Sequence, residues 1–154
     1  MLIRPDDLRG PEIGALLAAH MENSRRWSPP GSIHALDLDR LRTPDITFWT
    51  LWDGDELLGC GALRALSGGD GEIKSMHTAE KRRGRGAGAA MLRHIIAEAR
   101  KRDYRMLWLE TGSPEGFRPA REMYRKAGFV ECGPFGDYKP DPYSVYMRLD
   151  LSQG

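Results

Sequence analysis

The sequence predicts an α/β fold: a mixed, mostly antiparallel sheet with one central parallel crossover and flanking helices. Residues 46–52 are β-branched and aromatic, residues 57–66 continue an apolar strand pattern, and Asp53-Gly54-Asp55 separates the two. This arrangement indicates an antiparallel hairpin. Residues 72–110 then follow the order strand, loop, helix and strand, which is typical of a parallel crossover. A meander followed by a crossover places antiparallel and parallel strand pairs in one sheet.

The first half of the chain adds one helix and one irregular segment. Residues 11–23 carry apolar side chains at helical spacing, and Pro11 suits a first turn. Residues 24–44 are rich in Arg, Pro and Ser, which predicts an irregular excursion with a short helix over residues 37–42. Residues 72–78 alternate in character and predict a third, central strand.

The second half alternates helices and strands. From Gly88 a helix with one apolar face runs to near Asp103, and cations gather in its last turn, where the helix dipole favours them. Residues 117–127 form a second helix, for which Gly128 is the expected C-terminal cap. The remaining predicted strands are residues 105–110, a strand at Val130 and residues 145–149.

Composition and charge exclude several classes of protein. The 154 residues, 40% hydrophobic and 29% charged, suit one domain over residues 1–154. The net charge of +1 disfavours a nucleic-acid partner. Short apolar runs and a charged N-terminus disfavour a membrane partner and predict a cytoplasmic protein. Cys60 and Cys132 lie in no CxxC or Cys/His cluster, so neither a disulfide framework nor a metal site is expected.

A glycine- and arginine-rich loop, residues 81–88, stands between a predicted strand and a predicted helix. It contains Lys81, Arg82, Arg83 and Arg85 among alternate glycines. Glycines leave backbone N–H groups open to an anion, and the helix N-terminus adds partial positive charge. The loop therefore predicts a pyrophosphate site, although a charged strand-to-helix loop can also be plain solvated surface.

The same loop fits a looser dinucleotide-binding pattern. Gly84-x-Gly86-x-x-Ala89 is followed about twenty residues later by Glu110 at a strand end. A dinucleotide fold would turn directly from its first strand into this loop. Here a basic segment intervenes, and about half the chain precedes it, so a nicotinamide-dependent oxidoreductase is the weaker alternative.

The loop and its surroundings resemble the GNAT superfamily of N-acetyltransferases over nearly the whole chain. The matching residues are Arg83-x-x-Gly86-x-Gly88, the Glu-Ile-Lys strand before it, and Ala120-x3-Tyr124-x3-Gly128-Phe129 after it. The chain looks most similar to a bacterial subgroup of acetyltransferases assigned to the indole-3-acetate pathway. That likeness is carried by residues 28–32, 34–38, 47–49, 109–113 and 132–135.

The resemblance implies a GNAT-like fold and acetyl-CoA as the acetyl donor, with no metal. The strand before the loop would pair through its free backbone with the pantetheine arm, and Tyr124 would protonate the departing CoA thiolate. Many relatives carry an asparagine where this chain has Phe117. The implied cofactor-binding residues are Met76, His77, Thr78, Arg83, Gly84, Arg85, Gly86, Ala87 and Gly88.

An acceptor amine must lose a proton before it attacks, so a base is needed. Glu72, on the strand before the loop, is the first candidate, followed by Glu110 and His34, with solvent as a further route. Trp27, His34 and Glu110 are the predicted contacts to the acceptor, a small-molecule amine. The sequence leaves a monomer and a homodimer equally open, and a CoA-binding sensor without turnover is the main alternative to an enzyme.

Overall fold

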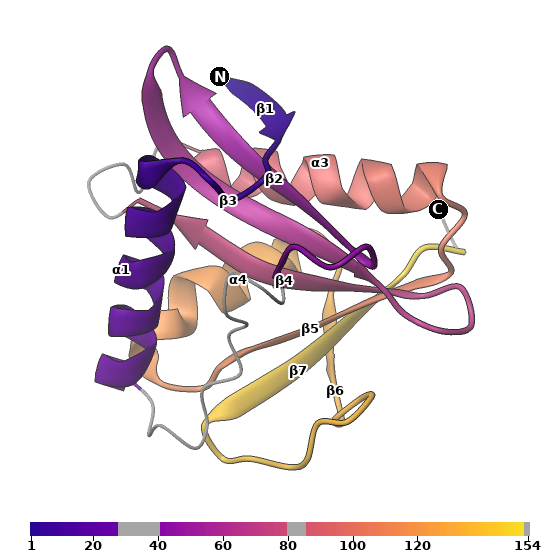
Figure 1. Cartoon of the computed structure of the whole chain (residues 1–154). Coiled ribbons are helices and arrows are strands. Elements are labelled where there is room, and N and C mark those ends of the chain that lie inside the picture. Colours follow the sequence, from indigo (N-terminus) through magenta and orange to yellow (C-terminus); the bar gives the residue numbers. More distant parts are fainter. Residues whose placement is uncertain (28–40, 80–85, 153–154) are drawn as a thin grey trace.

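The computed structural model describes residues 1–27, 41–79 and 86–152, with side chains described outside residues 20–27. Within these residues, seven strands form one sheet in the order β1-β2-β3-β4-β5-β7-β6 (Figure 1). Every neighbouring pair is antiparallel except β4 and β5, which are parallel. The strands are β1 (Leu2–Pro5), β2 (Ile46–Asp53), β3 (Glu56–Ala65), β4 (Gly71–Thr78), β5 (Met106–Gly112), β6 (Val130–Cys132) and β7 (Ser144–Asp150).

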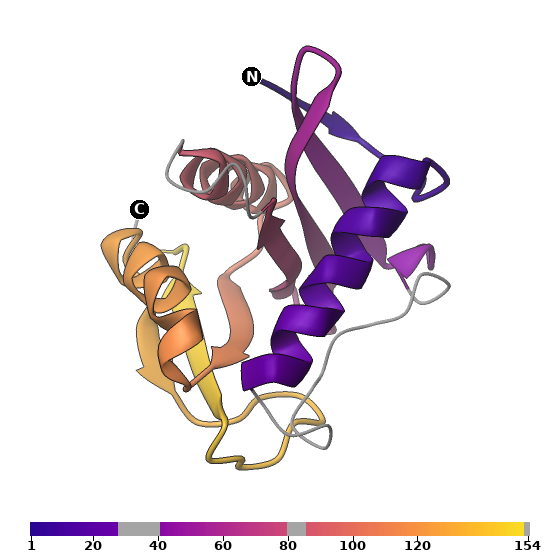
Figure 2. The same ribbon diagram turned by 90° about the vertical axis from the view of Figure 1, so that its left-hand side faces the viewer.

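Helices cover both faces of the sheet. Helix α1 (Pro11–Trp27) lies on one face, and α3 (Ala87–Lys101) and α4 (Arg118–Lys126) lie on the other (Figure 2). A short 3-10 helix, η3 (Glu115–Phe117), leads into α4. The crossover from β4 through α3 to β5 supplies the parallel pair.

Each face of the sheet has its own hydrophobic core. The larger core joins α3 and α4 to the sheet and includes the fully buried Leu63, Ile95 and Leu107. The smaller core packs α1 against Phe48 and Ala62. Alternation along the strands sends successive side chains to opposite faces, so β2 and β3 contribute apolar side chains to both cores.

The parallel pair is short and opens at one end. β4 and β5 pair only at Gly71, Glu72 and Ile73, opposite residues 107–109, and the two strands diverge beyond that point (Figure 1). The register of β3 with β4 also shifts between Cys60 and Ala62, and Ser75, on the facing stretch of β4, has a φ of 55°. Such a bulge bends a strand and resets which face its side chains occupy. Ile73 and Met76, three residues apart, therefore both contact the larger core.

The observed elements confirm the predicted fold class, and most boundaries agree within two residues. The first helix is longer than predicted because it continues to Trp27. β1 was not predicted as a strand, since its four residues form an edge paired only with β2. The predicted short helix over residues 37–42 falls largely outside the described residues.

Truncation of a core side chain tests this packing. Ile95→Ala removes a side chain with 0% exposure from α3 and is expected to lower the free energy of unfolding by about 2–5 kcal/mol. Urea denaturation measures the change. Arg93→Ala, at an exposed position of the same helix, is the control and should change stability by less than about 0.5 kcal/mol. Equal effects of the two substitutions would contradict the core assignment.

Candidate active site

A groove of about 320 Å³ lies where the open end of β4 meets the start of α3 and one side of α4. It is lined by the segment of β4 that no longer pairs with β5. Its described lining comprises Met76, His77, Thr78, Gly86, Ala87, Gly88, Ala89, Gly116, Pro119, Ala120, Met123 and Tyr124. The predicted residues Met76, His77, Thr78, Gly86, Ala87 and Gly88 are therefore brought together, while Arg83, Gly84 and Arg85 lie outside the described residues.

The N-terminus of α3 opens into this groove, and its N-cap residue, Gly86, has no side chain that could cap it. Gly86 precedes the helix with a φ of 79°, and the first turn contains no acidic residue. That left-handed conformation suits glycine, and uncapped N–H groups together with the helix dipole favour an anion. A β-carbon on Gly88 would lie 3.1 Å from Met123 Sδ and 3.4 Å from Thr78 Oγ1. Glycine at this position keeps the entrance open between α3, α4 and β4.

Tyr124 lies at the buried wall of the groove. Its side chain is 5% exposed, and its ring meets Phe129 edge-on at 5.7 Å. Burial, and secondarily the charge of Glu110, raise the pKa of the Tyr124 phenol. The group therefore stays protonated at neutral pH and can donate a proton or a hydrogen bond.

Phe117 and Arg121 help to hold the connection from β5 to α4. Phe117 packs its ring against Gly112, where any β-carbon would overlap it. Arg121 Nη1 donates hydrogen bonds to the Gly112 and Pro114 carbonyl oxygens at 2.8 and 3.0 Å. Phe117 thus helps to anchor the helix that carries Tyr124. This is the position at which many relatives carry an asparagine.

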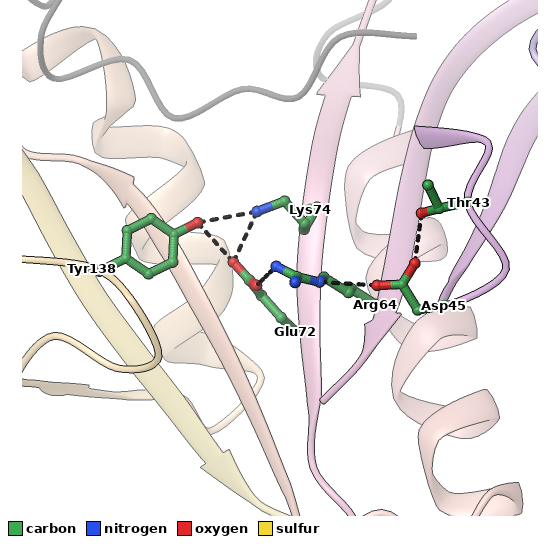
Figure 3. Close-up of polar contacts among 6 residues, drawn as sticks. All are labelled: Thr43, Asp45, Arg64, Glu72, Lys74 and Tyr138. Carbon is green, nitrogen blue, oxygen red and sulfur yellow. Dashed lines mark hydrogen bonds and ion pairs between the residues drawn. The ribbon is translucent and has the colours of Figure 1, made fainter. Parts of the chain in front are cut away.

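Glu72 is buried and fully engaged with other side chains (Figure 3). Its Oε2 accepts hydrogen bonds from Lys74 Nζ at 3.0 Å and from the Tyr138 hydroxyl at 2.8 Å. Its Oε1 lies 3.8 Å from Arg64 Nη1, and Arg64 in turn pairs with Asp45 at 3.1 Å. Lys74, Tyr138 and Arg64 therefore surround the two carboxylate oxygens of Glu72.

Glu110 lies on the neighbouring strand in a different electrostatic setting. Burial raises the pKa of its carboxyl to about 7, while Ser144 and the Lys74 ammonium oppose the rise and Glu72 and Asp141 add to it. A carboxyl with a pKa near neutrality exchanges protons readily under physiological conditions. Among the described carboxyl groups, Glu110 thus has the properties of a general base.

Aromatic side chains cover the sheet beside these carboxyls. Phe135 contacts Trp108, Tyr138 and Tyr146, with ring centroids 5.0–6.1 Å apart. Tyr138 comes from the loop of residues 133–143, between β6 and β7, and reaches Lys74 and Glu72. Sequence reasoning missed Tyr138 because 64 residues separate it from Lys74. Lys74 itself was detectable, since it lies two residues from Glu72 on the predicted strand and therefore shares its face.

Two predicted acceptor contacts are not located. Trp27 ends α1, with its side chain beyond the described atoms, and His34 lies outside the described residues. Within residues 1–19, 41–79 and 86–152, no three His, Cys, Asp or Glu side chains are grouped so that they could hold a metal ion. None of the described helices is long and apolar enough to cross a membrane.

Comparison with known families decides the class of protein. The sequence model described as "Acetyltransferase (GNAT) family" matches residues 14–129. The chain belongs to the GNAT family of acetyltransferases. It is 51% identical over 151 residues to the uncharacterized N-acetyltransferase YsnE of Bacillus subtilis (strain 168), which covers 98% of this chain and 100% of that protein. The present chain also shares 42% identity over 124 residues with the IAA acetyltransferase of Azospirillum brasilense, and the match covers 80% of each chain.

Solved structures agree with this assignment. A candidate acyl-CoA N-acyltransferase from Klebsiella pneumoniae superposes with a TM-score of 0.83, at 30% identity and over 97% of each chain. A GNAT family acetyltransferase from Elizabethkingia anophelis with acetyl-CoA bound superposes with a TM-score of 0.71, at 20% identity and over 97% of each chain. The predicted GNAT-like fold is confirmed.

The raised pKa of Glu110 makes stability depend on pH. A carboxyl that holds its proton more tightly when folded contributes stability at low pH, and this contribution is lost as pH rises towards 7. Relative to wild type, Glu110→Gln is therefore expected to gain about 2 kcal/mol between pH 5 and pH 8. Urea denaturation at the two pH values measures the difference. A stability difference that does not change with pH would contradict the raised pKa.

Proposed function

We propose that this enzyme transfers the acetyl group of acetyl-CoA to a primary amine of a small molecule, by direct attack within a ternary complex. The observation that carries the proposal is the groove at the open end of β4. It offers an unpaired strand edge, an uncapped helix N-terminus and the buried phenol of Tyr124 in one place. The structural relative with acetyl-CoA bound supports this choice of donor.

The donor would extend along β4 towards the start of α3. His77 and Thr78 pair with β3 on one side, and their other side faces the gap left by β5, where a pantetheine arm can add as an extra strand. The pyrophosphate would bind the residues of the loop, with Arg83, Gly84 and Arg85 next to the Gly86–Gly88 segment that lines the groove. Helix dipole and arginine charge both favour an anion there.

Glu110 is the better candidate for the base. The acceptor amine arrives as an ammonium ion, and a carboxylate with a pKa of about 7 can take its proton near neutral pH. Glu72 stays a predicted base, but its Oε2 already accepts two hydrogen bonds. The remaining acceptor contacts, Trp27 and His34, also stay predictions.

The chemical step uses no covalent enzyme intermediate. The neutral amine attacks the thioester carbonyl carbon, and the tetrahedral intermediate collapses with cleavage of the C–S bond. Tyr124 donates a proton to the leaving sulfur, and its phenolate takes up the proton that the amine nitrogen loses. The products are an acetamide and free CoA thiol. Burial raises the pKa of the Cys60 thiol to about 12, and burial also raises that of Cys132, so neither cysteine is an activated nucleophile.

The proposed reaction predicts selective binding and turnover. Calorimetric titration should show binding of acetyl-CoA and none of NAD, and the double charge reversal Arg83→Glu/Arg85→Glu should weaken acetyl-CoA binding at least ~10-fold. Thiol release from acetyl-CoA across a panel of small amines should identify an acceptor. Binding of acetyl-CoA without thiol release for any amine would instead support a CoA sensor. Binding of NAD without binding of acetyl-CoA would support an oxidoreductase.

Substitution of Tyr124 by phenylalanine separates packing from chemistry. General-acid catalysis typically contributes about 100- to 10,000-fold to the rate. Because water can donate the proton in place of the phenol, Tyr124→Phe should lower kcat at least ~10-fold. The KM for acetyl-CoA and the melting temperature should change little, because the ring is kept. Steady-state kinetics and thermal denaturation test this. Wild-type turnover, with chemistry rate-limiting, would assign the proton to another donor.

A further inference from the structure

Lys74 is a buried cation in the middle of the sheet. Its side chain is 7% exposed, and its Nζ donates to Glu72 Oε2 and to the Tyr138 hydroxyl, each at 3.0 Å. Because the Tyr138 hydroxyl itself donates to Glu72 Oε2 at 2.8 Å, the three groups form a closed triangle (Figure 3). Burial of a lysine costs free energy unless its charge is paired, so the triangle accounts for how the site tolerates this residue.

Lys74 and Glu110 directly follow the last paired positions of β4 and β5. Glu72 is aligned with Trp108 and Ile73 with Leu109, so Lys74 and Glu110 are the next residues on the two strands, at the point where β4 and β5 separate. Alternation puts both side chains on the face that also carries Glu72 and Trp108. The Lys74 ammonium thus forms an ion pair with Glu72 and also acts electrostatically on Glu110.

We propose that Lys74 is a positioning residue for acetyl transfer: it holds Glu72 in an ion pair and keeps Glu110 available to take the proton of the acceptor amine. This inference rests on the proposed function. Lys74 touches neither substrate in this scheme and acts through the two carboxyls. Tyr138 completes the arrangement, because its hydroxyl binds both members of the pair and joins the loop of residues 133–143 to β4.

The other groups around Glu110 would disfavour its ionised form without Lys74. Glu72 on β4 and Asp141 in the loop of residues 133–143 both raise the pKa of Glu110, and the Ser144 hydroxyl on β7 lowers it. The phenols of Tyr124, Tyr138 and Tyr146 also interact with its charge. Lys74 is the cation among the described groups that act on Glu110, and its effect exceeds that of Glu72.

Titration of the Glu110 carboxyl by carbon-13 NMR, in the enzyme without ligands, tests the inference directly. Lys74→Met should raise the titration midpoint by about 1 pH unit, since a nearby cation is lost, and Lys74→Arg should restore it. Glu72→Gln should lower the midpoint, and Glu72→Gln/Lys74→Met should lie between the two single variants. If Lys74→Met fails to fold, the comparison of Glu72→Gln with the double variant still isolates the effect of Lys74. Equal midpoints in these variants would overturn the proposal.

Kinetics link the titration to the reaction. With an amine that the enzyme acetylates, the acidic limb of kcat/KM against pH should move with the Glu110 midpoint in Lys74→Met. A limb that survives Glu110→Gln but disappears in Glu72→Gln would assign the base to Glu72 and overturn the inference. Absence of thiol release from the wild-type enzyme would contradict the proposed function alone, because the NMR titration of Glu110 needs neither substrate.

Discussion

The candidate site depends on one constraint in the sheet: β4 and β5 pair over three positions and then separate. A fully paired β4 would have no free edge, and the start of α3 would have no space opposite it. The bulge around Ser75 accompanies this opening and turns Met76 towards the larger core. Lys74 and Glu72 remain on the opposite face. The same local irregularity therefore shapes the groove and divides polar from apolar side chains along β4.

Two glutamates on adjacent strands experience opposite electrostatic environments. Glu72 has a lysine, a tyrosine hydroxyl and a more distant arginine around it. Glu110 is buried, and the opposing effects of Ser144 and Lys74 do not cancel the effect of desolvation, so its pKa rises. Buried carboxyls with unlike environments are a common source of distinct acid–base roles. The cost is a loss of stability once Glu110 ionises, which an enzyme can tolerate where the group serves chemistry.

Membership of the GNAT family settles the class of reaction, while the acceptor depends on the details of this chain. The fold supports many substrates through differences in loops and side chains. Here the loop of residues 133–143 brings aromatic rings and Asp141 next to Glu110. These residues therefore belong to the surroundings of the proposed proton acceptor.

The sequence by itself determined the order of most elements and the position of the glycine-rich loop that is predicted to bind an anion, because both follow from local patterns. Hydrophobic spacing defined α3, the Asp-Gly-Asp turn defined the β2–β3 hairpin, and glycines marked the start of α3. The candidate residues Glu72, Glu110 and Tyr124 were all named from their places on these elements.

The sequence could not supply the contacts and the burial of each carboxyl group. Lys74 and Tyr138 are 64 positions apart, and only the folded sheet brings them to the same Glu72 oxygen. Burial in the folded protein is the main cause of the raised pKa of Glu110. Desolvation and charge pairing depend on distances in three dimensions, which local sequence patterns do not encode.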